Sequence, residues 1–545
     1  MPEQAPAASS GSMRPDQVPI GTKSTHCAPK VMVVSPREYR EDVEVLDLQR
    51  SRTISLSLGP RSPQDIVPVA PAVDIDAEQY TRFTLARKVV ITCILAFCAL
   101  LSPVSSTMIL SAIPEVAADY NTSGDMISVS NALYLLSMGF SACFWGPMSS
   151  VFGRRWVNVA SAVQFCAFNI GTALAPNLGA YFVFRILTSF QGTGLLIVGN
   201  SCLADIYEPT ARATALGWFA LGTIVGPAFG PFIGGVIVTF HSWRVIFWVQ
   251  ASLGGLATVL LLFFLPETIP RTKLRTLQAI PNPTSRVVKV VSWMSPWRVV
   301  VLLFSYPNLL ITGLASSALI WNMYSILTAI RYVLNPRFDL TSPMQSGLFY
   351  IAPGCGYLAG SPLGGRLADN IVKKWIGRRG GARIAEDRLR SCYIWLGVVL
   401  PVSIILYGWS VQAEFGGIGL PVITLFVQGA VQWLCFPCLN TYALDVMQSH
   451  GLSAEVVAGN YMIRYFFAAL GSAICLPAIN GIGVGWFSTI SSSFLVFGAV
   501  GVWATIMWGP SWRNRVDAHK DRRRAERSRK REEARDTEVG PSSMD

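Results

Sequence analysis

Two similar segments end long apolar runs of this chain: WGPMSSVFGRR at residues 145–155 and GSPLGGRLAD at residues 360–369. Glycines such as Gly146 and Gly153 permit a tight turn. The arginines Arg154 and Arg155 can bond the carbonyl groups of helix ends or a facing carboxylate. The segments follow the second and the eighth apolar run, so their similarity indicates two homologous halves.

The composition excludes most classes of soluble protein. Of 545 residues, 51% are hydrophobic and only 14% are charged, and the mean hydropathy is +0.43. Soluble domains carry about 25% charged residues, because these cover a surface that faces water. A soluble enzyme, a coiled coil and a disordered scaffold are therefore excluded. The composition predicts an all-α membrane protein with many spans.

Apolar runs of about 20 residues recur from Val89 onward, and each is long enough to cross a hydrocarbon core of about 30 Å. They predict twelve transmembrane helices in two six-helix halves, near residues 89–113, 129–149, 157–176, 179–204, 212–238, 243–265, 299–328, 344–364, 391–411, 417–442, 456–480 and 484–509.

The segments outside these runs complete the predicted organisation. Residues 1–87 are rich in proline and serine, which predicts a disordered tail. The two halves extend over residues 88–266 and 299–510, with a linker at 267–298 and a basic tail at 511–545.

Loop charge predicts the orientation, because basic loops stay in the cytoplasm. The linker and the connection after the eighth run are rich in Lys and Arg. The connection after the first run contains Asp and Glu but no Lys or Arg. Both tails and the basic loops are thus expected in the cytoplasm. Asn121, in an Asn-Thr-Ser sequon, is expected outside as a glycosylation candidate.

Two features resemble binding sites of other kinds. Arg522-Arg523-Arg524 and Arg529-Lys530-Arg531 form basic runs that could bind nucleic acid, but a tail beside anionic lipid headgroups is the favoured reading. Cys435 and Cys438 have a CxxC spacing without a second cysteine pair or a nearby histidine, so no metal site is expected.

Further motifs make the pattern specific. The two loops resemble the signature loop of the major facilitator superfamily and its degenerate copy. FRILTSFQG (184–192) is similar to the family's buried-arginine motif, and ADIYEPTARA (204–213) is close to fungal members. GTIVGPAFGPFIGG (222–235) resembles the motif of the family's antiporters. Over residues 85–510 the chain therefore resembles the fungal twelve-span drug:proton antiporters.

This resemblance implies a secondary transporter whose halves rock around a central site. It implies export of an amphipathic small molecule, such as a drug, a secondary metabolite or a glycolipid, in exchange for protons. The proton gradient is the driving force, no cofactor is expected, and the chain is expected to act as a monomer in the plasma membrane, with the vacuolar membrane as the alternative.

Other functions stay open at this point. An organic-acid exporter or an uptake transporter would have the same fold, and a transporter-like membrane sensor belongs to another class. A membrane-embedded transferase is disfavoured, because the four histidines lack an HxxxD spacing. No nucleotide-binding loop appears, which disfavours ATP-driven transport.

Polar residues inside the apolar runs are the candidates for a substrate cavity, because ionisable groups in a bilayer are costly and usually functional. The basic candidates are Arg185 and Arg464. The uncharged candidates, some of which could merely join helices, are Asn131, Tyr134, Asn200, Asn322, Tyr324, Gln428, Gln432 and Asn440.

No carboxylate lies in the middle of a run, so proton coupling is expected at helix ends, with Asp205 and Asp445 as candidates. The family's signature loop usually has an acid where Ser150 stands, and the second copy has one in Asp369. A carboxylate partner for Arg154 and Arg155 is thus left open, with Glu208 or helix termini as alternatives.

Glycines at every fourth residue form two ridges on their helices. The first contains Gly222, Gly226, Gly230 and Gly234 and is interrupted by Pro227 and Pro231, and the second contains Gly356, Gly360 and Gly364. Small residues let helices approach closely in lipid. The ridges are predicted to meet each other at the interface between the halves and to limit leak.

Overall fold

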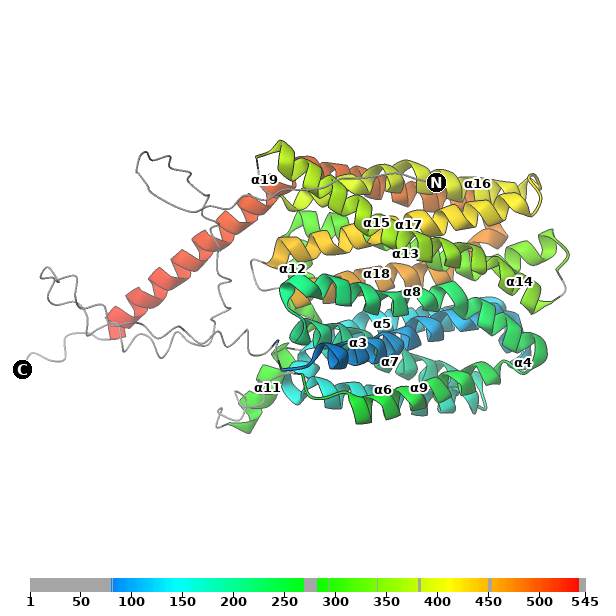
Figure 1. Cartoon of the computed structure of the whole chain (residues 1–545), viewed down its shortest axis with the longest axis horizontal. Helices are drawn as coiled ribbons and strands as arrows, with labels where there is room; N and C mark the ends of the chain where they lie inside the picture. The colour runs from blue at the N-terminus through cyan, green and yellow to red at the C-terminus, as the bar shows by residue number, and fades with distance from the viewer. Residues whose placement is uncertain are drawn as a thin grey trace, which may run out of the picture.

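The computed structural model describes residues 80, 82–268, 282–293, 295–340, 342–380, 384–448 and 453–538. Within these ranges the regular secondary structure is entirely helical. Almost all of the predicted tail at 1–87 and much of the predicted linker at 267–298 lie outside the described residues. Figure 1 shows long helices side by side, with α4 and α14 at one end of the bundle and α11 and α12 at the other.

The first half, as we use the term, contains the helices that precede the linker. They are α3 (Leu85–Thr107), the 3₁₀ turn η2 (Met108–Ala112), α4 (Ile113–Asp119), α5 (Gly124–Phe152), α6 (Arg154–Ala173), α7 (Leu178–Ile206), α8 (Pro209–Phe240) and α9 (Arg244–Phe264). The short helix α11 (Pro283–Trp293) lies in the linker.

The second half contains the remaining helices. They are α12 (Pro296–Ser305), α13 (Pro307–Arg337), α14 (Pro343–Phe349), α15 (Ile351–Arg378), the 3₁₀ helix η3 (Ala385–Ser391), the π-helical turn η4 (Trp395–Val399), α16 (Leu400–Gln412), α17 (Gly419–Gln448), α18 (Ser453–Ile482) and α19 (Val484–Glu538).

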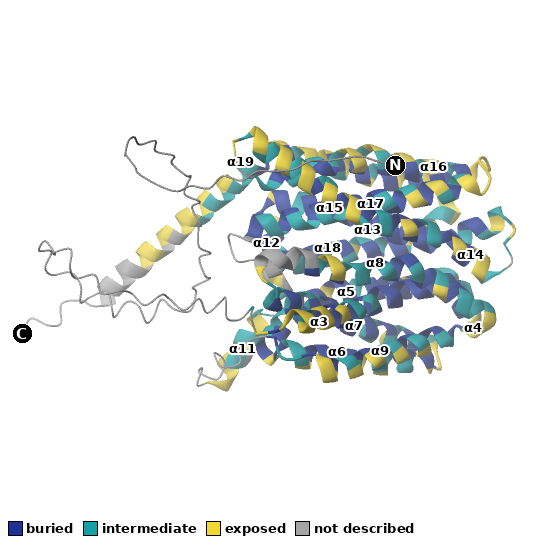
Figure 2. Ribbon diagram, in the orientation of Figure 1, coloured by how far each residue is buried: buried dark blue, intermediate teal, exposed yellow. Residues whose placement is uncertain are grey.

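Ten helices of the described residues are long and apolar enough to cross a membrane. The places of the third and the eighth predicted spans are taken by α6 and α15, which carry polar and basic side chains such as Asn158 and Lys373. The predicted all-α membrane fold is confirmed, whereas the number of twelve spans stays a prediction. Large apolar residues, among them Phe263 and Phe497, are exposed and suit contact with lipid. Figure 2 shows exposed positions on the outer helices of the bundle.

The last helix is longer than the sequence predicted. Beyond residue 510, α19 continues to Glu538, so the tail predicted at 511–545 is an extension of the last helix as far as it is described. Its Ala, Glu, Lys and Arg residues all favour helix. It projects from the bundle in Figure 1.

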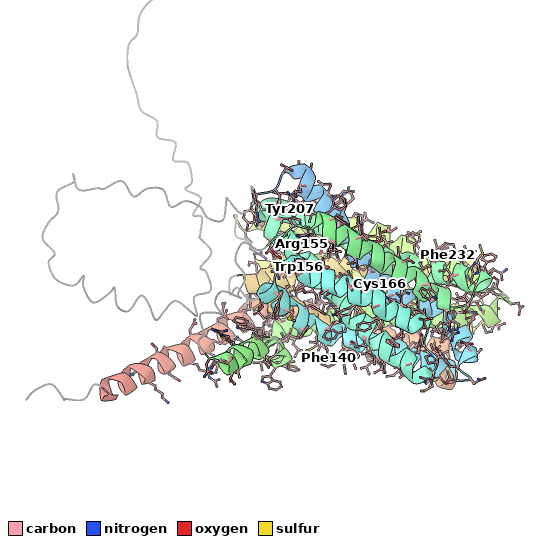
Figure 3. All side chains as sticks on the ribbon, turned by 90° about the horizontal axis from the view of Figure 1, so that it is seen from below. Phe140, Arg155, Trp156, Cys166, Tyr207 and Phe232 are labelled. Atoms are coloured by element: carbon pink, nitrogen blue, oxygen red, sulfur yellow. The ribbon has the colours of Figure 1, made fainter. Side chains whose placement is uncertain are left out.

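The two ends of the bundle differ in charge, and we name them by their residues. The basic end carries Gly153, Arg379 and the start of the projecting part of α19, and the Asn121 end carries α4 and α14. In Figure 3, Arg155, Trp156 and Tyr207 lie at the end of the bundle from which the last helix projects, and Phe232 lies toward the opposite end.

Helices in equivalent positions of the two halves make equivalent contacts. In the first half α3 packs on α8, α5 on α7, and α6 on α7 and α9. In the second half α13 packs on α18, α15 on α17, and α16 on α17 and α19. The halves meet where α5 contacts α18 and where α8 contacts α14 and α15. This pattern is that of two repeats related by exchange of the halves.

The prediction that the two glycine ridges meet each other is wrong. An added Cβ at Gly222, Gly226, Gly230 or Gly234 would lie within 2.5 Å of an atom of Ala96, Pro103, Thr107 or Met108, so this ridge faces α3 and η2 in the same half. An added Cβ at Gly356, Gly360 or Gly364 would lie within 2.5 Å of Phe426, Ala430 or Leu434, so that ridge faces α17. Each ridge thus holds one half together.

Other glycines bring α8 close to the second half. A Cβ at Gly354 would lie 2.6 Å from the Ala228 carbonyl oxygen, and one at Gly235 would lie 2.8 Å from the Pro343 carbonyl oxygen. Because every fourth residue returns to one face of a helix, these contacts use a different face from the ridges. Pro227 and Pro231 lie inside α8, which stays helical through both.

We expect Gly222→Ala to destabilise the protein by about 1–3 kcal/mol, the usual cost of overpacking. Its Cβ would lie 2.1 Å from the Ala96 carbonyl oxygen, so α3 and α8 must separate. Thermal unfolding in detergent measures the effect. Gly217→Ala is the matched control on the same helix, because a Cβ there meets nothing within 4 Å. Equal melting temperatures of the two variants would contradict the packing described here.

Candidate functional site

Arg185 of α7 is the polar centre of the first half. Its side chain is buried, with 1% of the residue exposed. Nη1 donates to the Ser105 carbonyl oxygen at 3.1 Å, and Nη2 donates to Asn131 Oδ1 at 3.0 Å. The guanidinium carbon lies 4.3 Å from the ring centre of Tyr134. Nε has no hydrogen-bond partner, and no described carboxylate pairs with this arginine.

Arg464 of α18 is a buried cation of the second half. Its Nε donates to the Asn460 carbonyl oxygen of the same helix at 2.9 Å. The guanidinium carbon lies 4.8 Å from the ring centre of Phe436 and 4.6 Å from that of Tyr461. Nη2 is buried without a hydrogen-bond partner, and the described residues give Arg464 no carboxylate. Each half therefore buries an arginine that has no carboxylate partner among the described residues.

Two of the predicted cavity residues bridge the halves. Tyr324 of α13 and Ser106 of α3 share a hydrogen bond of 3.1 Å between their hydroxyl groups. Asn131 of α5 donates from Nδ2 to Ser472 Oγ of α18 at 3.4 Å. Because Asn131 also accepts from Arg185, the first cation is linked to the interface between the halves.

The other predicted cavity residues lie in different surroundings. Gln428 Nε2 donates to Gln432 Oε1 at 2.5 Å on the buried face of α17. Asn322 joins α13 to α19 through a hydrogen bond of 3.3 Å to the Ser491 carbonyl oxygen, which is a contact within one half. Asn200 and Asn440 are half-buried. The structure therefore does not bring all of these amides to one surface.

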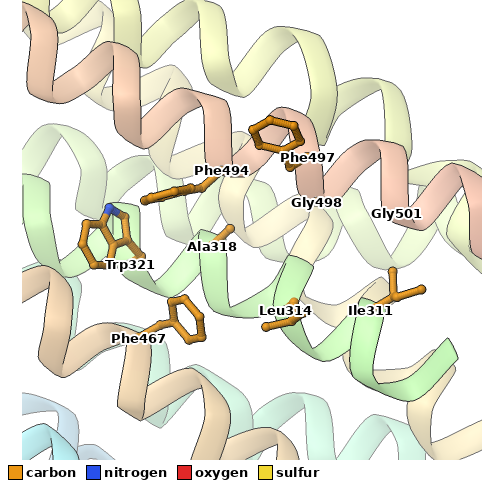
Figure 4. A pocket seen from close by; sticks show the side chains of 9 residues that line it. All are labelled: Ile311, Leu314, Ala318, Trp321, Phe467, Phe494, Phe497, Gly498 and Gly501. Carbon is orange, nitrogen blue, oxygen red and sulfur yellow. The ribbon is translucent and has the colours of Figure 1, made fainter. Parts of the chain in front are cut away.

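A largely apolar pocket of about 280 Å³ lies inside the second half, between α13, α18 and α19. Figure 4 shows rings of Trp321, Phe467, Phe494 and Phe497 around it. Phe494 and Phe497 are exposed on the outer face of the bundle, where lipid would contact them. This pocket does not lie between the halves, and none of the polar candidates lines it.

The first loop segment forms a network of charges at the basic end. Arg154 Nε lies 3.1 Å from Asp205 Oδ2, and Glu267 accepts hydrogen bonds from the backbone amides of Arg154 and Arg155 at 2.9 and 3.2 Å. Gly153 has a φ of +93°, and a Cβ on it would lie 2.5 Å from Glu267 Oε2. Only glycine fits this turn without strain.

The partners of the first-loop arginines, which the sequence left open, are thus identified. Arg154 pairs with the coupling candidate Asp205. Arg155 donates from Nη2 to the Leu262 carbonyl oxygen at 2.7 Å. Leu262 lies at the end of α9, so this contact matches the alternative of a helix terminus. Glu267, not singled out in the sequence, supplies the second carboxylate.

The second half has its own charge pairs at the basic end. Asp445 is the other coupling candidate, and its Oδ2 lies 3.5 Å from Nε of Arg388. The acids Glu386 and Asp387 are buried and pair with Arg513 and Arg379. Sequence reasoning missed both acids, because the many bases around them dominate this connection. Asp369 lies within α15 and is exposed, with no ion pair to a described residue.

An ion pair that the sequence did not predict joins the halves at the Asn121 end. Arg331 of α13 donates to both carboxylate oxygens of Glu115 on α4, with 2.6 Å between Nη1 and Oε2. Arg331 also donates to the Ser111 carbonyl oxygen. The predicted seventh span ended at residue 328, whereas α13 continues to Arg337, so a third buried arginine was overlooked.

The hydrogen bonds and ion pairs described above are thus distributed unequally. Those that join the halves, made by Ser106, Asn131 and Glu115, lie at the centre and at the Asn121 end. The described ion pairs of the basic end each join elements of one half. The described ion pair between the halves therefore lies at the Asn121 end.

The relation to known proteins agrees with this architecture. A sequence profile of the Major Facilitator Superfamily matches residues 95–471. The MFS antiporter QDR3 of Candida albicans is 25% identical over alignments covering 75% of this chain and 76% of the relative. Citrate exporter 1 of Aspergillus niger is 24% identical, covering 79% of this chain and 88% of the relative.

A solved structure shows the same fold. The D-xylose–proton symporter matches with a TM-score of 0.58 at 16% identity, covering 76% of this chain and 97% of the symporter. This likeness concerns the fold alone. Together with the profile, which spans more than half of the chain, it shows that the predicted membership is correct: the chain belongs to the Major Facilitator Superfamily of membrane transporters.

Proposed function

We propose that this transporter exports an amphipathic organic anion by alternating access, in exchange for protons. The observation that supports the charge of the substrate is the pair of buried arginines, Arg185 and Arg464, one in each half. Neither has a carboxylate partner among the described residues. The rest of the proposal follows from the family and from the fold.

An uncompensated charge in a membrane protein is costly, and such residues usually mark a substrate or ion pathway. Arg185 is partly compensated by the Ser105 carbonyl group and Asn131. The charge of Arg464 is compensated less, because the one hydrogen bond described for this arginine runs to a carbonyl group of its own helix. A bound anion would neutralise either guanidinium, and a guanidinium fork suits a carboxylate or phosphate group.

The surroundings of the two arginines favour a substrate that is also apolar. The rings of Tyr134 and Phe247 lie beside Arg185, and those of Phe436 and Tyr461 lie beside Arg464. Ligand sites that combine an apolar wall with a few polar anchors take amphipathic molecules. A drug, secondary metabolite or glycolipid with an acidic group would meet both requirements, and an organic acid would meet the first.

The direction and the coupling are supported by relatives. QDR3 is named an antiporter and the Aspergillus niger relative a citrate exporter. Export in exchange for protons makes the proton gradient the driving force, and we place its coupling at Asp205 and Asp445. This cycle requires neither a cofactor nor a second copy of the chain. The transporter would therefore work as a monomer without a cofactor.

The orientation that suits export places the basic end in the cytoplasm. The basic end carries Arg154, Arg379 and Arg513, as expected of cytoplasmic loops. Asn121 would then face the outside of the plasma membrane, or the lumen if the protein resides in the vacuole. Its position in an exposed turn with a φ of 50° suits attachment of a glycan.

We expect proteoliposomes to transport fluorescein, an amphipathic carboxylate, in preference to rhodamine 6G, an amphipathic cation of similar size. Arg464→Gln should lower fluorescein transport about tenfold, as loss of about 1.4 kcal/mol of binding would. Arg366→Gln, at an exposed position of α15, is the control and should transport normally. Preferred transport of rhodamine 6G, or full fluorescein transport by both Arg464→Gln and Arg185→Gln, would contradict an anionic substrate.

A second test concerns coupling. Asp205→Asn and Asp445→Asn should abolish accumulation of fluorescein driven by a pH gradient, because an amide cannot carry the proton. Exchange of labelled for unlabelled fluorescein without a gradient should continue, since it needs no proton movement. Asp339→Asn, at an exposed carboxylate in a turn without a described ion pair, is the control. Full gradient-driven accumulation by both variants would exclude these two carboxylates as the coupling groups.

A further inference from the structure

The ion pair between Glu115 and Arg331 crosses from one half of the transporter to the other. We propose that it is a latch: it holds the Asn121 end closed, and protonation of Glu115 releases it. The inference rests on the alternating access of the proposed function, and it adds a proton-binding group that differs from Asp205 and Asp445.

The latch has the geometry of a strong interaction. Two guanidinium nitrogens meet two carboxylate oxygens, and such forked pairs are stronger and more directional than single contacts. Arg331 also donates to the Ser111 carbonyl oxygen, so three contacts fix α13 to the end of the first span. The Arg331 side chain is 9% exposed and that of Glu115 is 30% exposed. The carboxylate is thus the partner that protons from the medium can reach.

Neighbouring contacts close the same end without charge. The position of Gly124 at the start of α5 lies directly against the Tyr332 hydroxyl group, and Gly347 of α14 lies against Phe232 of α8. Opening this end requires the halves to rotate apart, which repacks such interfaces and separates any ion pair between them. Neither contact involves a carboxylate, so protonation of a carboxylate leaves both groups unchanged. Among these contacts the ion pair is the one that a proton can switch.

The other titratable groups near the latch come from each element packed around it. Tyr332 of α13 lies within electrostatic reach of Arg331, Glu115 and Asp125, the last on α5. Tyr350, next to α14, interacts with Arg331 and donates to the Leu327 carbonyl oxygen. Asp119 of α4 is bound to Arg244 and Trp243 of the first half. Among the described ion pairs, that of Glu115 is therefore the one that joins the two halves.

The sign of the effect follows from the charges. With Glu115 ionised, its attraction to Arg331 favours the closed Asn121 end. With Glu115 protonated, the attraction between full charges is lost while Arg331 keeps its charge, so the halves separate more readily. Acid at this end therefore favours opening, and closing the end favours release of the proton.

Hydrogen exchange of the full chain in nanodiscs, read by mass spectrometry, tests the latch without any substrate. The readout is the protection of residues 331–337 and 343–349, both in the second half. Glu115→Gln and Arg331→Gln should each lower this protection about threefold or more at pH 7.5, as loss of a partly exposed ion pair would. The wild type should lose protection between pH 7.5 and pH 4, and Glu115→Gln should show no such further loss.

Asp119→Asn is the matched control. It removes a carboxylate from the same helix, but the partner Arg244 belongs to the same half. Protection of residues 331–337 and 343–349 should therefore stay at the wild-type level. Wild-type protection in Glu115→Gln, or a pH response as large as that of the wild type, would overturn the proposal. Loss of protection that extends to α6 in both latch variants would also overturn the proposal. The ion pair would then stabilise the fold as a whole and not only the closed Asn121 end.

The outcome is independent of the substrate proposal. A transporter of cations would still need to close its Asn121 end, so failure of fluorescein transport leaves this test intact. Conversely, an unchanged exchange pattern in Glu115→Gln would remove the latch and leave the preference for anions untouched.

Discussion

A charge inside a hydrocarbon core has no water to solvate it, and the arrangement of this transporter depends on that constraint. The chain has few charged residues, and those it buries are held in specific surroundings. Arg331 is neutralised by Glu115. Arg185 is held by a carbonyl group, an amide and an aromatic face, without a described carboxylate. The first arrangement fixes two elements to each other, whereas the second leaves a positive charge that a ligand can neutralise.

The same absence of water changes how helices associate. Lipid chains are as apolar as the side chains they contact, so close packing rather than water exclusion holds helices together. The two glycine ridges bring α3 against α8 and α15 against α17, within the respective halves. Each half thereby becomes a closely packed unit. The contacts between the units are made by α5 with α18 and by α8 with α14 and α15, and these are the surfaces that rocking must rearrange.

The fold could be predicted from the sequence because it depends on properties of contiguous segments. Run length, loop charge and the repeated loop motif indicate the spans and the two halves. Arg185 and Arg464 could be identified because each interrupts an apolar run. The Glu115–Arg331 pair could not be predicted, because the two residues are separated by 216 positions and their contact depends on how the halves pack. The prediction that the two glycine ridges meet was wrong for the same reason. The spacing of the glycines identifies one face of a helix, but not which helix packs against that face.

The two ends of the bundle consequently have different roles. At the basic end, Arg154–Asp205 and Arg388–Asp445 lie in equivalent places of the repeats and each ties one half to itself. Rocking carries such pairs along as parts of rigid bodies, without breaking them. At the Asn121 end, Glu115 and Arg331 belong to different halves and have no equivalent pair among those described at the basic end. Protonation of Glu115 therefore acts between the halves at one end, whereas protonation of Asp205 or Asp445 acts within one half at the other.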